Sequence, residues 1–439
     1  MPLAIIVKAQ GHEVAGSDRA LDQGRTAPKF DWLRRHGIAL HAQDGSGIVS
    51  ADQIVVASAA VEGTVPDMIA AARVGAPRLS RAQLLADLFN AAPLSIGVAG
   101  TSGKSTVTGM IGWILEACGK HPTVMNGAVM KNFVSPETQF ASALVGQGGA
   151  FESEVDESDG SIALYNPHIA VLNNIALDHK SMEELRALFS GYVARARVAV
   201  LNADHAEVMA LKTANARTYS IGGAADVVAT DVVERPDGVD FKVNGIMVSL
   251  QVPGRHNVSN ALAALTVAEV AGVSLEDATR AISGFTGLRR RLEVVGTAGG
   301  ITVIDDFGHN PDKISASLST LHAFPGRLLI MFQPHGYGPL RQMSAELIAT
   351  FAQHLSAQDV LLLPDPVYQG GTTDRSVGSD AIVAGVVAAG RKAEHIADRA
   401  ACAEALLALA KPNDRIIIMG ARDDTLATFA VDLLARLAH

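Results

Sequence analysis

Cysteine, aromatic side chains and long apolar runs are all scarce in this sequence. The two cysteines, Cys118 and Cys402, lie in segments with a helical pattern, so we expect no disulfide framework and a reducing compartment. The longest apolar stretches, such as the one that starts at Gly326, are too short to span a bilayer and fit buried strands. The first ten residues lack a basic start and a cleavage site. These absences predict a cytoplasmic protein that is not inserted in a membrane.

An excess of positive charge is also missing. The net charge is −9, which argues against non-specific binding of nucleic acid. It does not exclude an anionic small molecule, because the backbone N–H groups of a loop can hold phosphate. With 48% hydrophobic and 18% charged residues, the chain has the composition of a soluble protein with packed cores. A prior of roughly 150 residues per domain predicts about three domains for this length.

Apolar strand patterns, loops and amphipathic helix patterns alternate along the chain. This alternation predicts an α/β protein with parallel sheets and helices on both faces of each sheet. The second block begins with the strand 94–100, and the third contains the strand 301–307 and closes on an amphipathic helix. The predicted domain boundaries are 1–92, 93–293 and 294–439.

A glycine-rich loop follows the strand 94–100 and leads into a helix pattern. Its glycines allow a tight turn that points backbone N–H groups at phosphate oxygens, and the helix N-terminus adds its positive dipole end. A lysine in such a loop can reach the β- and γ-phosphates, and the next hydroxyl can bind Mg²⁺. The alternative is a Gly/Ser-rich turn with a solvated lysine. The loop predicts ATP binding by Gly100, Thr101, Ser102, Gly103, Lys104, Ser105 and Thr106.

Two further apolar strands of the second block end in potential metal ligands. One runs into an acidic segment that contains Glu154 and Glu157, and the next runs into Asp178 and His179. Carboxylate and neutral imidazole both bind Mg²⁺ or Mn²⁺, and strand carboxyl ends meet at one edge of a parallel sheet. Taken singly, the acidic turn could be merely solvated and the histidine could cap a helix or pack. Together they predict a metal site formed by Ser105, Glu157 and His179.

These segments, in this order, resemble the Mur ligase family, and most closely its alanine-adding branch. The similarity covers essentially the whole chain. It is carried by GHEVAGSD, GTSGKST, ESEVDESDGS, NIALDH, GRHNVSNALAA, GLRRRL, DDFGHNP and FQPHGY. The resemblance implies a shortened Rossmann-like first domain for a UDP-type substrate, a central P-loop ATPase domain and a Rossmann-like third domain for the amino acid.

The resemblance also assigns roles to single residues. It places Lys104 and Ser105 on the nucleotide phosphates and the metal ion, with Glu157 and His179 as further metal ligands and Glu154 as the second choice. Asn257 and Asn260 match positions that face adenine, where an amide offers both a donor and an acceptor. For these two residues, capping of a helix is the alternative.

The third domain supplies the rest of the implied site. Arg291 matches an arginine that reaches the γ-phosphate, although a solvated linker charge is the alternative. Asp306 matches a ribose-contacting aspartate and His309 a neighbouring catalytic residue, whereas the Asp-Asp pair could instead cap the helix that begins at Pro311. Asp18 and His335, in two of the shared motifs, are expected to contact substrate.

The implied reaction joins an acid to an amine. The substrate carboxylate attacks the γ-phosphate of ATP, with charge screened by Mg²⁺, Lys104 and Arg291, and an amine then attacks the acyl phosphate. Closure of the third domain would protect that intermediate from water. No lysine stands in the stretch LRALFSGYVA (185–194) after His179, where several Mur ligases place a carbamylated lysine, and this absence also favours the alanine-adding branch.

The sequence departs from the family pattern in three places. Met1 falls where relatives have completed a strand and a glycine-rich loop, so either the UDP-diphosphate cradle is shortened or the chain starts inside a longer one. Gly336 and Pro339 replace two arginines that would face the carboxylate of the incoming amino acid. Arg422 stands where relatives usually show glycine, and Phe307 replaces a usual tyrosine.

Amine identity therefore does not transfer from the family. Arg341 or Arg375 could supply a replacement cation, although a solvated loop charge is the alternative for Arg375. We expect a small-molecule acid and an amino acid or short peptide as substrates, and a monomer or homodimer. Two alternatives remain open at this point: a ligase for a non-peptidoglycan acid, and a nucleotide-binding subunit without ligase activity.

Overall fold

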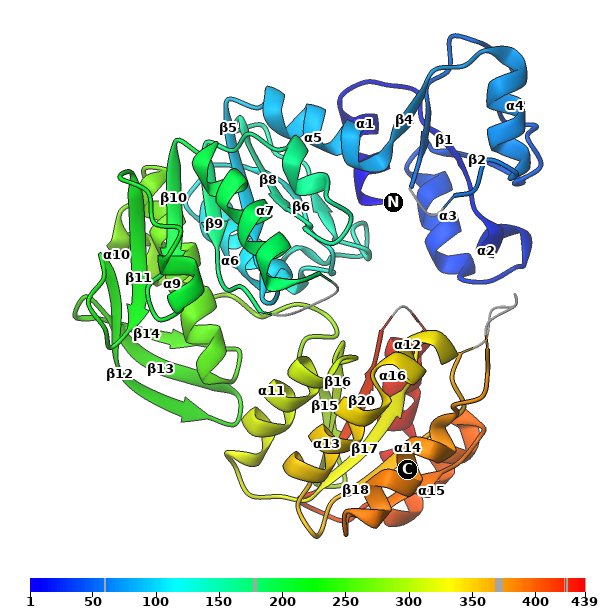
Figure 1. The fold of residues 1–439 in the computed structure, drawn as a ribbon, viewed down its shortest axis with the longest axis vertical. Helices are drawn as coiled ribbons and strands as arrows, with labels where there is room; N and C mark the ends of the chain where they lie inside the picture. The colour runs from blue at the N-terminus through cyan, green and yellow to red at the C-terminus, as the bar shows by residue number, and fades with distance from the viewer. Residues whose placement is uncertain (59–60, 177–179, 368–373, 422, 424, 439) are drawn as a thin grey trace. The chain divides into compact units, whose positions relative to one another are not determined.

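The computed structural model describes residues 1–58, 61–176, 180–367, 374–421, 423 and 425–438 (Figure 1). The chain forms two compact units. The first contains residues 1–233, 239–251 and 256–286, and the second contains 234–238, 252–255 and 287–439. Each unit is an α/β structure with its own sheets and core, which confirms the predicted fold class. Among the described helices, none combines the length and hydropathy that crossing a bilayer requires.

The first ninety residues form two separate parallel strand pairs, β1 with β2 and β3 with β4. The Ser17 hydroxyl donates to Asp67, and Asp67 also accepts from the backbone N–H of Gly45, so the loops around the two pairs are tied together. The elements are α1 (Pro2–Ala9), β1 (Ala15–Ser17), α2 (Arg19–Asp22), α3 (Ala27–Arg35), β2 (Ala39–His41), β3 (Val55–Ala57), α4 (Pro66–Val74), β4 (Arg78–Ser80) and α5 (Arg81–Ala91).

The rest of the first unit contains a ten-stranded sheet in the order β14-β13-β12-β11-β10-β9-β5-β8-β6-β7. Its centre is parallel, as predicted, but β6 with β7 and β13 with β14 are antiparallel pairs that the sequence pattern did not predict. The strands are β5 (Leu94–Ala99), β6 (Thr123–Met125), β7 (Ala143–Leu144), β8 (Ala150–Glu154), β9 (Ile169–Leu172), β10 (Val198–Asn202), β11 (Ala216–Ile221), β12 (Val227–Arg235), β13 (Gly238–Val243) and β14 (Ile246–Leu250).

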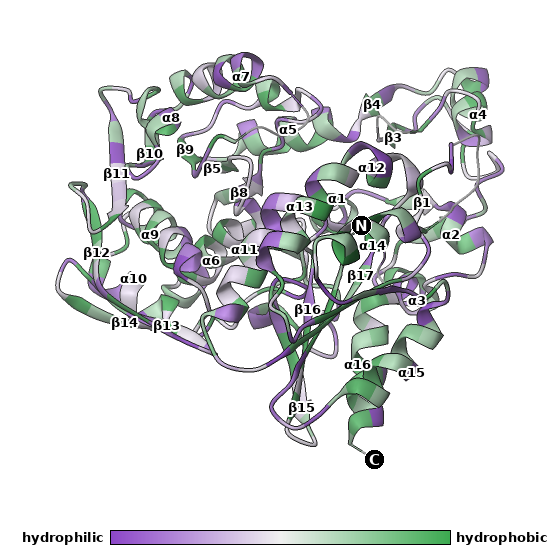
Figure 2. Ribbon diagram, turned by 60° about the horizontal axis from the view of Figure 1, so that its bottom comes forward, coloured by the Kyte–Doolittle hydropathy of each residue, from purple (hydrophilic) through white to green (hydrophobic). Residues whose placement is uncertain are grey.

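Helices cover this sheet because each buries an apolar stripe against it. Figure 2 shows both purple and green turns on α7, as expected for a helix with one buried face. On that side, Phe89, Phe189 and Tyr192 are fully buried in one core cluster. The helices of this part are α6 (Lys104–Ala117), α7 (Met182–Ala194), α8 (Ala206–Met209), α9 (Arg255–Val270) and α10 (Leu275–Ile282), with short 3-10 turns at Lys131–Phe133 and Ser161–Leu164.

A buried carboxyl group lies between β8 and α6. Glu152 is fully buried, neither of its oxygens has a hydrogen-bond partner among the described residues, and it lies beside Gly112 of α6. Burial, and to a lesser extent the charge of Glu154, raises the pKa of Glu152 well above its ordinary value of 4.5. Burial in the core therefore favours the uncharged form of this side chain.

Replacing Glu152 with methionine is expected to raise the free energy of unfolding near neutral pH by about 1–3 kcal/mol, because an unpaired polar group leaves the core. Above pH 4.5 the unfolded chain releases the Glu152 proton and the folded chain keeps it, so the wild type loses stability as pH rises towards the raised pKa. Denaturant unfolding of both proteins from about pH 5 to about pH 8 measures this difference. Identical pH dependence in the two proteins would contradict it.

The second unit is built on a six-stranded sheet in the order β15-β16-β20-β17-β18-β19, parallel except for β15. Residues of α11, α13 and α14 pack on one face and residues of α15 and α16 on the other, as predicted. The strands are β15 (Glu293–Ala298), β16 (Ile301–Asp306), β17 (Leu328–Gln333), β18 (Val360–Leu363), β19 (Ala393–His395) and β20 (Arg415–Gly420). The helices are α11 (Pro311–His322), α12 (Tyr337–Gln342), α13 (Ser344–His354), α14 (Ser379–Ala388), α15 (Arg399–Leu409) and α16 (Thr425–Leu437).

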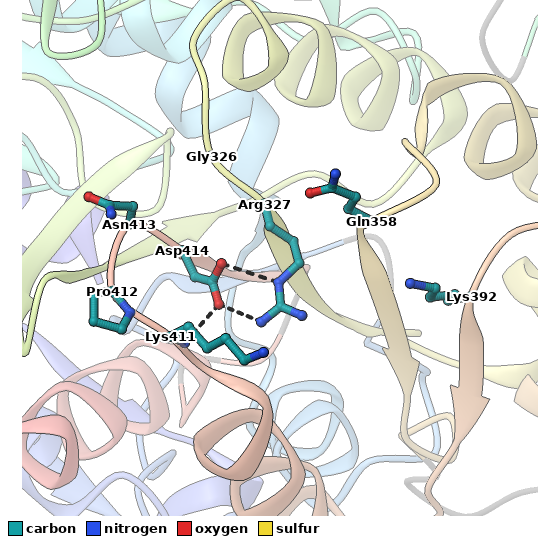
Figure 3. Close-up of a pocket in the computed structure, with 8 residues that line it drawn as sticks. All are labelled: Gly326, Arg327, Gln358, Lys392, Lys411, Pro412, Asn413 and Asp414. Atoms are coloured by element: carbon teal, nitrogen blue, oxygen red, sulfur yellow. Dashed lines mark hydrogen bonds and ion pairs between the residues drawn. The ribbon is translucent and has the colours of Figure 1, made fainter.

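The loops that precede β17, β18, β19 and β20 line an open cavity of about 370 Å³ (Figure 3). An ion pair lies in its lining, in which Arg327 Nε and Nη2 donate to the two carboxylate oxygens of Asp414 at 3.2 and 2.6 Å. Arg327 also donates to the carbonyl of Leu409 at 2.7 Å. This cavity lies at the amino ends of the strands, whereas ligands of parallel sheets bind at the carboxyl ends. We therefore assign Arg327 a structural role.

Candidate functional site

The glycine-rich loop between β5 and α6 has the geometry predicted for a phosphate loop. Gly100 and Gly103 have φ angles of +131° and +85°, which favour glycine. A Cβ atom on Gly103 would lie 2.8 Å from Oδ1 of Asn260, and one on Gly100 would lie 3.1 Å from the carbonyl oxygen of Asn174. A side chain at Gly103 would require Asn260 to move, and one at Gly100 would make a tight contact with the backbone of Asn174, so packing adds to the conformational preference for glycine.

The end of β9 holds this loop in place. Asn174 Oδ1 accepts from the backbone N–H of Ser102 at 2.8 Å, and Asn174 Nδ2 donates to the Ser102 carbonyl at 3.1 Å. The Thr101 hydroxyl and Ala176 exchange two further hydrogen bonds. Asn173 is buried, and its Nδ2 has no partner among the described residues. The sequence motif contains these two asparagines, but no role was predicted for them. Two polar residues at the end of a buried strand next to a phosphate loop would have indicated that they support the loop.

Lys104 and Glu157 form an ion pair at the loop. Lys104 Nζ lies 3.0 Å from Glu157 Oε2 and donates to the Gly100 carbonyl at 2.7 Å. The two side chains are only 16% and 7% exposed. Low exposure strengthens the pair relative to one at the surface. The structure thus brings the predicted phosphate-binding lysine and the predicted metal ligand together.

The second candidate glutamate lies close by. Glu154 Oε1 accepts from the backbone N–H of Gly127, and the neighbouring Asn126 donates from Nδ2 to the Ser105 carbonyl at 2.9 Å. Ser105 itself is buried in the first turn of α6. His179, the third predicted ligand, lies outside the described residues. Within the described residues, no three His, Cys, Asp or Glu side chains form a metal cluster.

Asn257 and Asn260 lie on the first turns of α9, beside the phosphate loop. Asn257 is buried, and its Oδ1 accepts from Asn260 Nδ2 at 3.0 Å. Because α9 begins at Arg255, Asn257 is a helical residue and does not cap the helix, so the capping alternative is wrong for this residue. Contact with adenine stays a prediction for both residues.

The three consecutive arginines before β15 have different environments. Arg290, with φ of +60°, is only 9% exposed and donates to the carbonyls of Asp423 and Gly420 at 2.9 and 2.7 Å. Both guanidinium groups lie over the Phe307 ring, that of Arg290 at 5.3 Å from its centre and that of Arg291 at 4.7 Å. Arg290 is thus fixed by the second unit, and Arg291 stacks on the aromatic ring that replaces the family's usual tyrosine.

Asp306 is fixed by three donors at the end of β16. It accepts from the backbone N–H groups of Leu292 and Gly308 at 3.0 and 3.1 Å and from the Ser317 hydroxyl at 2.7 Å. The cap of α11 is Asn310, whose Oδ1 accepts from the N–H of Lys313. The alternative in which the Asp-Asp pair caps this helix is therefore wrong, and ribose contact stays a prediction.

The other aspartate of the pair, Asp305, faces the interior. Burial raises its pKa to about 6, against the opposing effect of Arg290, whose Nε lies 3.3 Å from Asp305 Oδ1. This ion pair joins the end of β16 to the arginine that precedes β15.

Two histidines meet at the carboxyl ends of β16 and β17. The rings of His309 and His335 lie 5.5 Å apart in an edge-to-face arrangement, and His309 also contacts Phe307. Burial, followed by the charge of Lys313, lowers the pKa of His309 to about 3. His309 is therefore uncharged near neutral pH and can serve as a hydrogen-bonding group rather than as a cation.

The predicted replacement cations lie beyond β17. Arg341 of α12 forms an ion pair with Asp374, so its charge is partly neutralised. Arg375 is exposed, and the structure leaves its role open. A Cβ on Gly338 would meet nothing within 4 Å, and one on Gly336 would meet only Pro339 at 3.6 Å. This loop therefore has room where relatives carry arginines.

Asp18 follows β1 and caps a short helix. Its Oδ1 accepts from the backbone N–H of Ala20 at 2.8 Å, in α2. The side chain is exposed. This capping bond explains the aspartate locally, and substrate contact by Asp18 stays a prediction.

Comparison with known proteins gives matches along the whole chain. Residues 1–92 match the Mur ligase family catalytic domain, residues 98–268 the Mur ligase middle domain, and residues 290–422 the Mur ligase glutamate ligase domain. A UDP-N-acetylmuramate–L-alanine ligase of Agrobacterium fabrum is 32% identical over 450 residues, covering 96% of this chain and 92% of that protein. One of Synechococcus is 34% identical and covers 96% and 81%.

Solved structures share the fold. A UDP-N-acetylmuramate–alanine ligase of Thermotoga maritima superposes with a TM-score of 0.77 at 22% identity, covering 99% of this chain and 95% of that one. A murein peptide ligase of Psychrobacter arcticus gives 0.72 at 22% identity and covers 100% and 96%. At this identity the two structures establish the architecture only.

Proposed function

The chain belongs to the Mur ligase family, and on that premise we propose that it joins a muramyl-type carboxylic acid to an amino acid or a preformed peptide. It is an ATP-dependent ligase that forms a carbon–nitrogen bond, as its relatives are. The observation that carries the proposal is the phosphate loop with its Lys104–Glu157 pair, within a chain that matches such ligases over 96% of its length. We also propose the domain boundaries 1–92, 93–293 and 294–439.

The reaction needs charge screening rather than a protein nucleophile. An oxygen of the substrate carboxylate attacks the γ-phosphorus, the bond to the β-phosphate oxygen breaks, and ADP leaves. The amine nitrogen then attacks the acyl carbon, phosphate departs with its electron pair, and the ammonium proton is lost to solvent. In this scheme Lys104 neutralises charge on the transferring phosphoryl group. To do so, its ammonium group must leave Glu157 and contact the nucleotide phosphates.

The residues around the loop suit a hard divalent cation. The Ser105 hydroxyl and the carboxyl groups of Glu157 and Glu154 are oxygen donors, which Mg²⁺ prefers, and Glu157 lies 3.0 Å from the phosphate-loop lysine, Lys104. We propose Ser105, Glu157 and His179 as its ligands, with Glu154 as second choice. When bound, Mg²⁺ supplies neutralisation of phosphate charge.

Each remaining site residue is proposed for one step. Arg291 stacks on the Phe307 ring, whereas Arg290 donates to the carbonyls of Asp423 and Gly420, and we assign Arg291 to the γ-phosphate. The uncharged His309 and its neighbour His335 would orient the amine through hydrogen bonds, since a pKa of about 3 makes His309 a poor base.

L-Alanine is expected to be a poor amine substrate. Each charge-assisted contact to a carboxylate contributes about 1.5–3 kcal/mol, so the absence of arginines at Gly336 and Pro339 should weaken L-alanine by roughly a hundredfold or more. The space at Gly336 and Gly338 fits a larger amine. A panel of amino acids and short peptides, scored for ADP formation with UDP-N-acetylmuramate and with UDP-free muramic acids, measures this preference. Saturation by L-alanine below about 1 mM would show that other residues hold its carboxylate.

A further inference from the structure

A half-buried arginine that belongs to none of the sequence motifs lies at the carboxyl edge of the second sheet. Arg399 is the first residue of α15, and its side chain is 24% exposed. Its guanidinium donates to Gln333 Oε1 from Nε at 3.1 Å and from Nη2 at 2.9 Å. It also donates to Asp423 Oδ2 at 2.5 Å and to the Thr425 hydroxyl at 2.8 Å. Arg399 thus joins the ends of β17 and β20 and the start of α16.

The contact with Gln333 fixes the orientation of its amide. An amide carries a donor and an acceptor, and a guanidinium only donates, so Arg399 must face the oxygen of Gln333. The Gln333 Nε2 group is thereby turned to the carbonyls of Pro334 and Asp365, at 3.2 and 2.8 Å. Because Gln333 is only 2% exposed, water cannot readily replace these bonds. Pro334, the first residue after β17, is therefore held by the Gln333 amide N–H, and Arg399 fixes the orientation of that amide.

The same arginine is tied to the segment before β15. The backbone carbonyl of Asp423 accepts from Arg290 Nη1 at 2.9 Å, and Arg290 pairs with Asp305. A continuous set of polar contacts therefore runs from Asp305 through Arg290, Asp423 and Arg399 to Gln333. It spans the carboxyl ends of β16, β20 and β17, the edge at which ligands of parallel sheets bind.

We propose that Arg399 is a positioning residue for the incoming amine, acting through the amide of Gln333 on the loop that begins at Pro334. The inference rests on the proposed ligase function. The loop carries His335, and its neighbours Gly336 and Pro339 lack the cations that would otherwise hold an amine substrate. Because cationic side chains are absent at these two positions, the positions of the loop backbone and of His335 determine the orientation of the amine relative to the activated acid. A shift of about 1 Å in such a group can cost a hundredfold in rate.

The test measures the KM values of amine, acid and ATP, together with kcat and thermal stability, for the wild type and three variants. Arg399→Gln removes the guanidinium. Gln333→Glu keeps an acceptor for Arg399 but turns an oxygen, in place of the N–H donor, towards the two carbonyls. Arg327→Gln is the matched control, because Arg327 is 20% exposed, pairs with Asp414 and lies at the opposite edge of the same sheet.

Arg399→Gln and Gln333→Glu are both expected to raise the amine KM at least about tenfold, while the KM values for ATP and acid change less than about twofold. Arg327→Gln should lower thermal stability and leave the amine KM unchanged. An active wild type whose amine KM is unmoved by Arg399→Gln or by Gln333→Glu would overturn the positioning role alone. A wild type without amine-dependent turnover would instead overturn the proposed function, and this inference with it.

Discussion

Replacing Lys104 with alanine is expected to lower the rate of ADP formation by at least about a hundredfold, since loss of one preorganised charge typically costs about 3 kcal/mol in the transition state. Lys104 is the cation of the phosphate loop, and only 16% of its side chain is exposed, so solvent cations replace it poorly. Steady-state ADP release at saturating substrates measures the effect. Near-normal ligation by Lys104→Ala would refute the assignment of this lysine.

The Lys104→Ala variant also leaves Glu157 buried without its cation, which by itself costs stability. The double variant Lys104→Ala/Glu157→Gln removes both charges and separates the two effects. Its thermal stability should recover towards that of the wild type, and its turnover should not. Recovery of turnover in the double variant would mean that Lys104 serves only to neutralise Glu157.

The second large effect concerns the metal ion. Glu157→Gln keeps the shape of the side chain and removes its charge, so the Mg²⁺ concentration needed for half-maximal activity should rise at least about tenfold. Loss of a residue that only hydrogen-bonds to a metal ligand already has an effect of about this size. Titration with Mg²⁺ at saturating ATP measures it. The control is Asp159→Asn in the same acidic segment, whose carboxylate is exposed and accepts from the N–H of Ser161.

Glu154→Gln decides between the two glutamates. If Glu154→Gln abolishes activity while Glu157→Gln retains the normal Mg²⁺ requirement, Glu154 is the ligand and Glu157 serves mainly as the partner of Lys104. If neither substitution changes the requirement, a metal site at this sheet edge is wrong.

The sequence predicted the fold where local pattern and packing agree. Buried strands such as 94–99 and 328–333 are recognisable as apolar runs. The phosphate loop is recognisable by glycines at positions where the backbone has a positive φ angle. The prediction of parallel sheets did not include the antiparallel pairs of the first unit, although Asn244–Gly245, with φ angles of +46° and +89°, is a typical hairpin turn between β13 and β14. Short strands such as β7, with two residues, leave no periodic signal at all.

Site residues were predictable only where the residue type and its local sequence motif together indicate a chemical role. A lysine that follows glycines in a loop indicates a phosphate contact. Arg399 and Gln333, by contrast, lie 66 positions apart in the sequence, and only the fold brings them within hydrogen-bonding distance. The environments of Arg290 and Arg291 also needed the structure, since the sequence shows three identical neighbours, whereas the fold places Arg290 on the carbonyls of Asp423 and Gly420. The caps of helices α9 and α11 could likewise be identified only from the helix boundaries and the hydrogen bonds in the structure.

The most direct test of the central claim is ADP formation by the purified chain with UDP-N-acetylmuramate and the amine panel, with acid or amine omitted in turn. We expect repeated turnover only when both substrates are present, together with a new amide bond in the product. ATP binding without turnover, for every acid and amine pair, would contradict the account and indicate a nucleotide-binding subunit without ligase activity.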